Sequence, residues 1–113
     1  MYLKRKFVQT KRFAKDWENL NLTDDDLSVL EYMLLENTKL GKVIKGTKGL
    51  RKLRFRLNSK GSRGGARICY VDFESKETIV FINAYAKNIK ENLTDEEKKS
   101  INVAIAFLEK NII

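Results

Sequence analysis

Residues 50–86, LRKLRFRLNSKGSRGGARICYVDFESKETIVFINAYA, decide the fold of this chain. The stretch begins with apolar and cationic side chains in strict alternation, the period-two pattern of a strand with one buried face. Two further strand-like runs, Ala66–Phe73 and Thr78–Ala86, are joined by the polar sequence ESKE, which predicts an antiparallel hairpin. Together the three segments predict an antiparallel meander.

The N-terminal third predicts one strand and two helices. Residues 3–8 have the pattern of a strand, and apolar residues recur at helical spacing over residues 13–20. Thr23 precedes three aspartates, which predicts an N-cap and a first turn that suits the helix dipole, so a second helix should run to about Glu36. A metal site at Asp24–Asp26 is the alternative. Consecutive residues of a helical turn point in different directions, which favours capping.

A last helix is predicted at the C-terminus, where Thr94 and Glu97 form a capping box ahead of an apolar stripe. The predicted order is β-α-α-β-β-β-α, and helices followed by an antiparallel meander are typical of an α+β fold. We expect a single domain over residues 1–113 with a mainly antiparallel four-stranded sheet. The helices should cover one face of this sheet and leave the other for a ligand.

Positive charge is concentrated in one part of the sequence. Residues 39–67 contain eleven Lys or Arg and no Asp or Glu, whereas residues 1–38 carry a net charge of −1 and residues 68–113 a net charge of −2. A segregated charge of this size is typical of a protein that binds a polyanion. Nucleic acid is the first candidate.

The composition argues against several other classes of protein. The chain has no His and a lone Cys69, so it can form neither an internal disulfide nor a zinc site of Cys and His ligands. It has no run of eighteen apolar residues, and its amphipathic N-terminal stretch lacks the apolar core of a signal peptide. We therefore expect a cytoplasmic protein with no membrane segment, no metal and no other cofactor.

The candidate binding face lies on the cationic strand. Lys52, Arg54 and Arg56 project from one face at intervals of about 7 Å, close to the spacing of successive phosphates in a single strand. A solvated face that guards against edge pairing is the alternative. Because a solubilising face usually interleaves both signs, further cations in this region favour binding. These are Lys48, Arg51, Lys60, Arg63 and Arg67.

A second polar cluster follows the last predicted strand. Tyr85 can stack on an unpaired base, and Lys87, Asn88 and Lys90 lie close to it in the sequence. Packing of Tyr85 in the core is the alternative.

The residue types limit the chemistry that this face can perform. Imidazole catalysis is excluded without His, and the basic span has no carboxylates to hold a catalytic metal. Cleavage of RNA needs neither, because the substrate 2′-hydroxyl supplies the nucleophile, and the protein has only to orient it, stabilise the phosphorane and move protons. Crowded cations favour the neutral form of a lysine, which makes Lys52 the best-placed candidate base, whereas arginine suits transition-state stabilisation.

The run GTKGLRKLRFRLNSKGSRGGARICYVDF, followed by INAYAKNIKENLTDEE, resembles the RelE/HigB-type toxins of bacterial type II toxin–antitoxin modules, especially the HigB-like branch with its glycine-bracketed basic loop. The resemblance covers nearly the whole chain. It implies a ribosome-dependent mRNA endoribonuclease that acts in the ribosomal A site and is held inactive by a cognate antitoxin. An antitoxin with a helix-turn-helix domain is the expected partner.

The resemblance also implies residue roles. Lys52 and Arg54 match a pair of basic strand residues, one of them the general base, and Arg67 matches the arginine that stabilises the phosphorane. Lys87 lies where the family carries basic or polar residues. There are two departures: Arg54 is a poor proton acceptor, and Asn88 stands where some members have a general-acid arginine. Lys87 or Lys90 would then donate the proton, and Tyr85 would supply a stacking aromatic.

Two other functions are compatible with the same sequence. A non-catalytic toxin of the same fold, like the ParE-type inhibitors of gyrase, is possible because Arg54 and Asn88 depart from the catalytic pattern. A simple single-strand RNA-binding module would bind isolated RNA with a salt slope of roughly −0.7 per phosphate neutralised.

Overall fold

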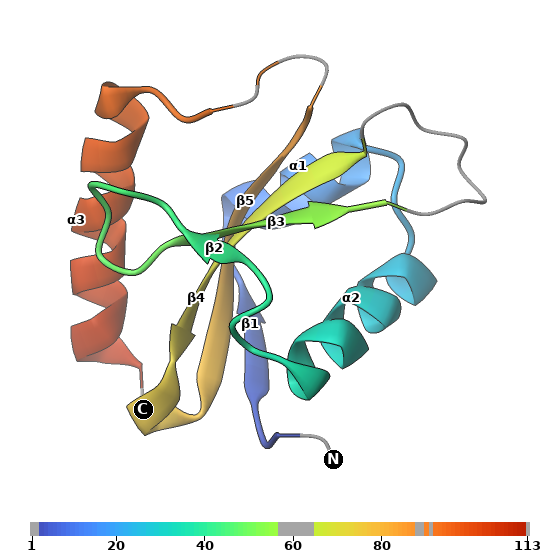
Figure 1. The fold of residues 1–113 in the computed structure, drawn as a ribbon, viewed down its shortest axis with the longest axis horizontal. Coiled ribbons are helices and arrows are strands. Elements are labelled where there is room, and N and C mark those ends of the chain that lie inside the picture. The colour runs from blue at the N-terminus through green and yellow to red at the C-terminus, as the bar shows by residue number, and fades with distance from the viewer. Residues whose placement is uncertain (1–2, 57–64, 88–89, 91, 113) are drawn as a thin grey trace.

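The computed structural model describes residues 3–56, 65–87, 90 and 92–112, and it places a five-stranded sheet between helices on both sides (Figure 1). The strands are β1 (Lys6–Gln9), β2 (Lys42–Val43), β3 (Arg51–Phe55), β4 (Ala66–Phe73) and β5 (Thr78–Ala86). The helices are α1 (Lys11–Asn19), α2 (Asp24–Glu36) and α3 (Asp95–Asn111), and the short 3-10 helix η2 (Glu74–Lys76) joins β4 to β5.

The sheet has the strand order β1-β5-β4-β3-β2. Strand β1 runs parallel to β5, and every other neighbouring pair is antiparallel. The α+β class and the mainly antiparallel sheet are therefore confirmed, and β4 and β5 have the predicted bounds. The count of four strands was wrong, because β2 adds a fifth strand. A strand of two residues is too short for period-two alternation to reveal it.

One side of the sheet is held to α1 and α2 by a chain of aromatic rings. Phe81 of β5 stacks on Phe7 of β1 at a centroid distance of 5.7 Å and on Phe13 of α1 at 4.8 Å. Trp17 continues the chain from Phe13 to Phe55 of β3, at 5.4 and 5.8 Å. The stack thus joins three strands to α1, and the buried Leu30 and Leu34 of α2 lie in the same hydrophobic cluster.

Helix α3 covers the other side of the sheet (Figure 1). Its Ile101 and Ile105 pack with Val71 of β4 and with Val80 and Ile82 of β5. The prediction that all helices share one face was wrong. The physical reason is that β4 and β5 are apolar on both faces and buried along almost their whole length, so both faces need cover.

Threonine caps begin all three helices. The predicted capping boxes are confirmed, with Thr23 and Asp26 exchanging hydrogen bonds at the start of α2, and Thr94 and Glu97 at the start of α3. Thr10 caps α1 by accepting a hydrogen bond from the Phe13 N–H. The three aspartates of α2 therefore lie in a capped first turn, as the sequence predicted.

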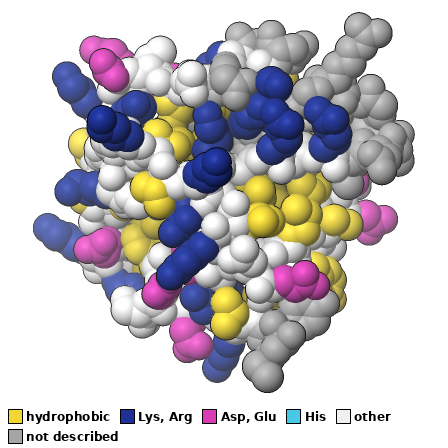
Figure 2. Space-filling view, viewed as in Figure 1, with side chains coloured by type: hydrophobic (Ala, Val, Ile, Leu, Met, Phe, Trp, Pro, Cys, Tyr) yellow, Lys and Arg dark blue, Asp and Glu magenta, His cyan; other side chains and the backbone are white. Residues whose placement is uncertain are grey.

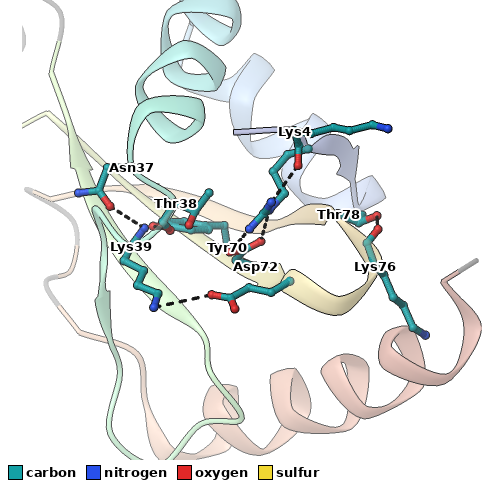
Figure 3. A network of polar contacts seen from close by, with 10 residues as sticks. Lys4, Asn37, Thr38, Lys39, Tyr70, Asp72, Lys76 and Thr78 are labelled. Carbon is teal, nitrogen blue, oxygen red and sulfur yellow. Dashed lines mark hydrogen bonds and ion pairs between the residues drawn. The ribbon is translucent and has the colours of Figure 1, made fainter. Parts of the chain in front are cut away.

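At the η2 end of the sheet, cations are paired with carboxylates (Figure 3). Arg5 forms an ion pair with Asp72 at 2.7 Å, and Lys39 lies 3.8 Å from Glu74. In the same network the Tyr70 hydroxyl donates to the Thr38 carbonyl at 2.8 Å. This end of the sheet is electrostatically balanced.

No helix in the described ranges is long and apolar enough to cross a membrane. Within the same residues, no three acidic or Cys side chains gather as a metal-binding group.

The aromatic stack predicts which substitutions destabilise the fold most. Replacing the fully buried Phe81 by Ala should lower the free energy of unfolding by about 3–5 kcal/mol, because the change leaves a cavity between β1, β5 and α1. The matched control is Phe107→Ala on α3, which removes a ring that is 63% exposed and should change it by no more than about 0.5 kcal/mol. Urea denaturation measures both, and equal effects of the two variants would contradict this packing.

Candidate nucleic-acid interface

Strand β3 places apolar and cationic side chains on opposite faces of the sheet. Leu53 and Phe55 are buried in the cluster with α1 and α2, whereas Arg54 is exposed and Lys52 half-buried on the side of α3. The predicted alternation is therefore confirmed. It directs Lys52 and Arg54 to one face.

Strand pairing extends these two positions into rows across the sheet. Arg54 pairs with Arg67 of β4, which pairs with Tyr85 of β5. Lys52 pairs with Cys69 in the neighbouring row. Directly paired residues point to the same face with Cβ atoms about 5 Å apart, so two arginines and a tyrosine stand side by side. We call Lys52, Arg54, Arg67, Tyr85 and Lys90 the cationic face.

Lys52 is tied to the segment that leads into α3. Its Nζ donates a hydrogen bond to Oδ1 of Asn92 at 3.0 Å. This contact fixes the lysine side chain along the surface between β3 and the start of α3. Asn92 thus orients the residue that the sequence predicts as the general base.

Lys90 lies between an aromatic ring and a carboxylate. Its Nζ is 5.1 Å from the centroid of the Tyr85 ring and forms an ion pair with Glu97 in the first turn of α3. Arg12 of α1 lies 4.0 Å from the same carboxylate. The hydrogen bond from Lys90 and the capping bond from the Thr94 N–H lower the pKa of Glu97. A negative charge therefore holds Lys90 at the edge of the cationic face.

Arg67 and Cys69 form the floor of the cationic face. Arg67 is 3% exposed, so its guanidinium does not lie open on the surface as that of Arg54 does. Cys69 is fully buried, and desolvation raises the pKa of its thiol to about 12, although the Lys52 charge opposes the shift. The thiol is protonated at neutral pH and is unsuited to nucleophilic chemistry.

A close approach of backbones brings Lys87 to the same end of the sheet. Gly65 has φ +63°, and a Cβ at this position would lie 2.6 Å from the carbonyl oxygen of Phe55, so only glycine fits. The Gly65 carbonyl in turn accepts a hydrogen bond from the Lys87 N–H at 3.2 Å. Lys87 is half-buried just beyond β5, and Arg56 is exposed just beyond β3.

The structure separates one predicted binding residue from the others. Arg51 precedes Lys52 on β3 and therefore points to the opposite face, where its Nη1 donates to the Gly41 carbonyl at 2.7 Å. The predicted contacts of Lys60, Arg63 and Asn88 lie outside the described residues.

Three residues of this site were not identified as functional from the sequence. Asn92 begins an Asn-x-Thr triplet that does not point to RNA chemistry, Arg12 belongs to no motif, and Glu97 is recognisable only as the second member of a capping box. Asn92 contacts Lys52, Glu97 contacts Lys90, and Arg12 contacts Glu97. These contacts come from packing α1 and α3 around the end of β5, which no local pattern reports.

Figure 2 displays the charge of this side of the molecule. Lys and Arg side chains form a band that runs across the upper half of the view, with few Asp or Glu among them. In the described part of the chain, Arg54 makes no ion pair with a carboxylate. Lys90 is paired with Glu97, but Arg54 has no carboxylate partner among these residues, unlike Arg5 and Lys39 at the η2 end of the sheet, and this suits an anionic ligand.

The lowered pKa of Glu97 predicts a pH dependence of stability. Because its folded pKa lies below the ordinary value of 4.5, the carboxylate contributes stability that is fully present above that value and is lost as the pH falls through the folded pKa. The variant Glu97→Gln keeps an oxygen for the capping bond to Thr94 but loses the charge. It should lack this acid-sensitive contribution, which is below about 1 kcal/mol for a partly exposed pair.

Urea denaturation of both proteins between pH 3 and pH 7 measures this difference. Glu96→Gln on the same first turn is the control, because Glu96 is exposed. Parallel pH profiles for wild type and Glu97→Gln would contradict the ion pair.

The comparisons with known proteins agree with this architecture. The family model described as the RelE toxin of the RelE / RelB toxin-antitoxin system matches residues 5–111. A mutant of the E. coli toxin RelE in the free state superposes with a TM-score of 0.57 at 17% identity, covering 88% of this chain and 96% of that one.

Two toxin–antitoxin complexes also contain similar chains. A chain of the intact E. coli RelBE complex matches with a TM-score of 0.53 at 19% identity and covers 76% of this chain and 96% of its own length. A chain of the E. coli DinJ–YafQ complex matches with a TM-score of 0.54 at 14% identity, covering 80% of this chain and 100% of that one. At these identities the structural likeness shows a shared fold, and the family model spans nearly the whole sequence. The chain therefore belongs to the RelE toxin family of toxin–antitoxin systems.

Proposed function

We propose that this RelE-family toxin is a ribosome-dependent endoribonuclease that cleaves mRNA without a catalytic metal, by attack of the substrate 2′-hydroxyl. The observation that carries the proposal is the pairing of Arg54 with Arg67 next to Lys52 on one face of the sheet. Such a surface binds phosphate and also offers groups for proton transfer. The resemblance of the sequence to RelE/HigB-type toxins, now supported by the family match, implies the ribosome as the place of action.

Lys52 is the proposed general base. A lysine can accept a proton from the 2′-hydroxyl only as a neutral amine. Strand alternation places Lys52 on the same face of the sheet as Arg54, so its amine lies next to the proposed phosphate site. The hydrogen bond to Asn92 sets the direction of the side chain. Arg54 keeps its charge and is assigned to phosphate binding.

Arg67 is the proposed stabiliser of the phosphorane, opposite Arg54 in the β3–β4 register. Because Arg67 is 3% exposed, its guanidinium would have to become accessible when the substrate binds. A buried position suits this role, since a charge in a less polar setting stabilises a developing dianion more strongly than one in water.

The proposed proton donor to the leaving 5′-oxygen is Lys90 or Lys87. Lys90 is a charged ammonium held by Glu97 beside the Tyr85 ring, which places it at the β5 side of the cationic face. The Tyr85 ring is half-buried, and we assign it to stacking on a base as well as to holding Lys90.

A cognate antitoxin is the proposed partner, because two of the similar structures are toxin–antitoxin complexes. A helix-turn-helix domain on that antitoxin, the HigB-like branch and a cytoplasmic location remain predictions.

Two substitutions at one position test the base. In a purified translation reaction, Lys52→Ala and Lys52→Arg should both slow cleavage of ribosome-bound mRNA by about 10²–10⁴-fold, the usual contribution of general acid–base catalysis. Lys52→Arg keeps the positive charge but cannot accept a proton, so an active Lys52→Arg enzyme would remove the base role. The control is Lys15→Ala on the exposed side of α1, which should cleave like wild type.

The same reaction separates the alternatives. A wild-type protein that leaves mRNA intact would contradict the proposed function, and gyrase–DNA cleavage complexes in cells expressing the toxin would then favour a ParE-like inhibitor. Tight binding to isolated RNA without cleavage would favour a plain RNA-binding module.

A further inference from the structure

A cavity of about 290 Å³ opens beside the cationic face, between β2 and the start of α3. Lys42, Val43, Ile44 and Lys45 form one wall, Asn92, Leu93 and Lys98 form the other, and Lys52 lies between them. The cavity therefore shares one residue, Lys52, with the proposed reaction centre.

The charge of this cavity has one sign. Of the eight described residues that line it, four are lysines and none is acidic. Within the described residues, Lys42, Lys45 and Lys98 make no ion pair with a carboxylate. Crowding like charges without compensation destabilises a folded protein, so the arrangement points to a ligand that supplies the missing negative charge.

A second cavity serves as an internal comparison. It has a volume of about 590 Å³, lies at the η2 end of the sheet, and is lined by Lys48, Arg51 and Lys76 together with three carboxylates, those of Asp72, Glu74 and Glu109. Its charges are balanced within the protein. The larger cavity thus lacks the uncompensated positive charge that distinguishes the smaller one.

The walls of the lysine cavity are held in place before any ligand binds. Asn102 of α3 clasps the turn after β2, donating to the Gly46 carbonyl at 3.0 Å and accepting from the Lys48 N–H at 2.9 Å. The stem of Lys98 runs beside Gly46, and the Lys52–Asn92 hydrogen bond joins the two walls. A preformed site loses less entropy on binding than one that must be ordered.

We propose that this cavity binds the backbone phosphate of the nucleotide next to the cleaved one; the inference rests on the proposed function. Lys52 lines the cavity, and Arg54 lies two residues further along the same face of β3, about 7 Å away by strand geometry and close to the spacing of successive phosphates in a single strand. The volume accommodates a phosphate with its ribose. The apolar side chains of Val43, Ile44 and Leu93 contact the sugar, and the lysines bind the phosphate as point charges.

The test compares two short probes whose 2′-O-methyl groups block the nucleophile: a dinucleotide with one phosphodiester and a trinucleotide with two. NMR titration of the wild type should show the trinucleotide binding about tenfold more tightly, with amide shifts at Leu93 and Lys98. The variant Lys42→Ala/Lys45→Ala/Lys98→Ala should bind both probes alike, and its salt slope for the trinucleotide should be shallower by about 0.7.

The control variant is Lys11→Ala/Lys15→Ala/Lys110→Ala, which removes the same charge from exposed positions elsewhere and should keep the wild-type preference. Thermal unfolding checks folding, and the cavity variant should melt at the wild-type temperature or above. A cavity variant that still prefers the trinucleotide would overturn the proposal. Two other results would also overturn it. One is a cavity variant that loses affinity only for ribosomes, because the phosphate would then belong to ribosomal RNA. The other is a set of amide shifts caused by inorganic phosphate but not by the trinucleotide.

The titration uses neither ribosomes nor cleavage, so the two proposals fail separately. A wild type that does not cleave mRNA counts against the proposed function and leaves the result of the titration standing. A wild type that cleaves but shows no trinucleotide preference counts against the cavity alone.

Discussion

The alternation along β3 links the stability of this protein to its charge. Leu53 and Phe55 can be buried against α1 and α2 only in the register that turns Lys52 and Arg54 to the other face. A shift by one residue would place the cations in the apolar core, at a cost far above the stability of a small domain. The core therefore fixes the cationic face, and the pairing of β3 with β4 brings Arg67 opposite Arg54.

The parts of the fold that the sequence predicted are those governed by local patterns. The bounds of β4 and β5 and the capping boxes of α2 and α3 depend on neighbours in the chain, and they match the structure. Strand β2 was missed because two residues cannot show a period. The position of α3 was wrong because an apolar stripe shows that a helix is buried, but not against which face of the sheet.

The same distinction holds for the candidate site. Lys52, Arg54 and Arg67 could be grouped from strand periodicity and charge, whereas Asn92 and Glu97 meet the cations only through tertiary packing. Charge density alone grouped Arg51 with the other candidate binding residues. Arg51 belongs to the basic segment of the sequence, but its side chain points to the opposite face of the sheet. Proximity in sequence is thus a poor guide to proximity across a sheet, where the side chain direction changes at every residue.

The central claim is that the cationic face lets the substrate 2′-hydroxyl act as the nucleophile. Analysis of the ends of mRNA cut on the ribosome by the wild-type protein tests this claim most directly. Attack by the 2′-hydroxyl leaves a 2′,3′-cyclic phosphate, or the 3′-phosphate formed from it, upstream of the cut and a 5′-hydroxyl downstream. Fragments that carry a 3′-hydroxyl and a 5′-phosphate would contradict the account, because they require water as the nucleophile.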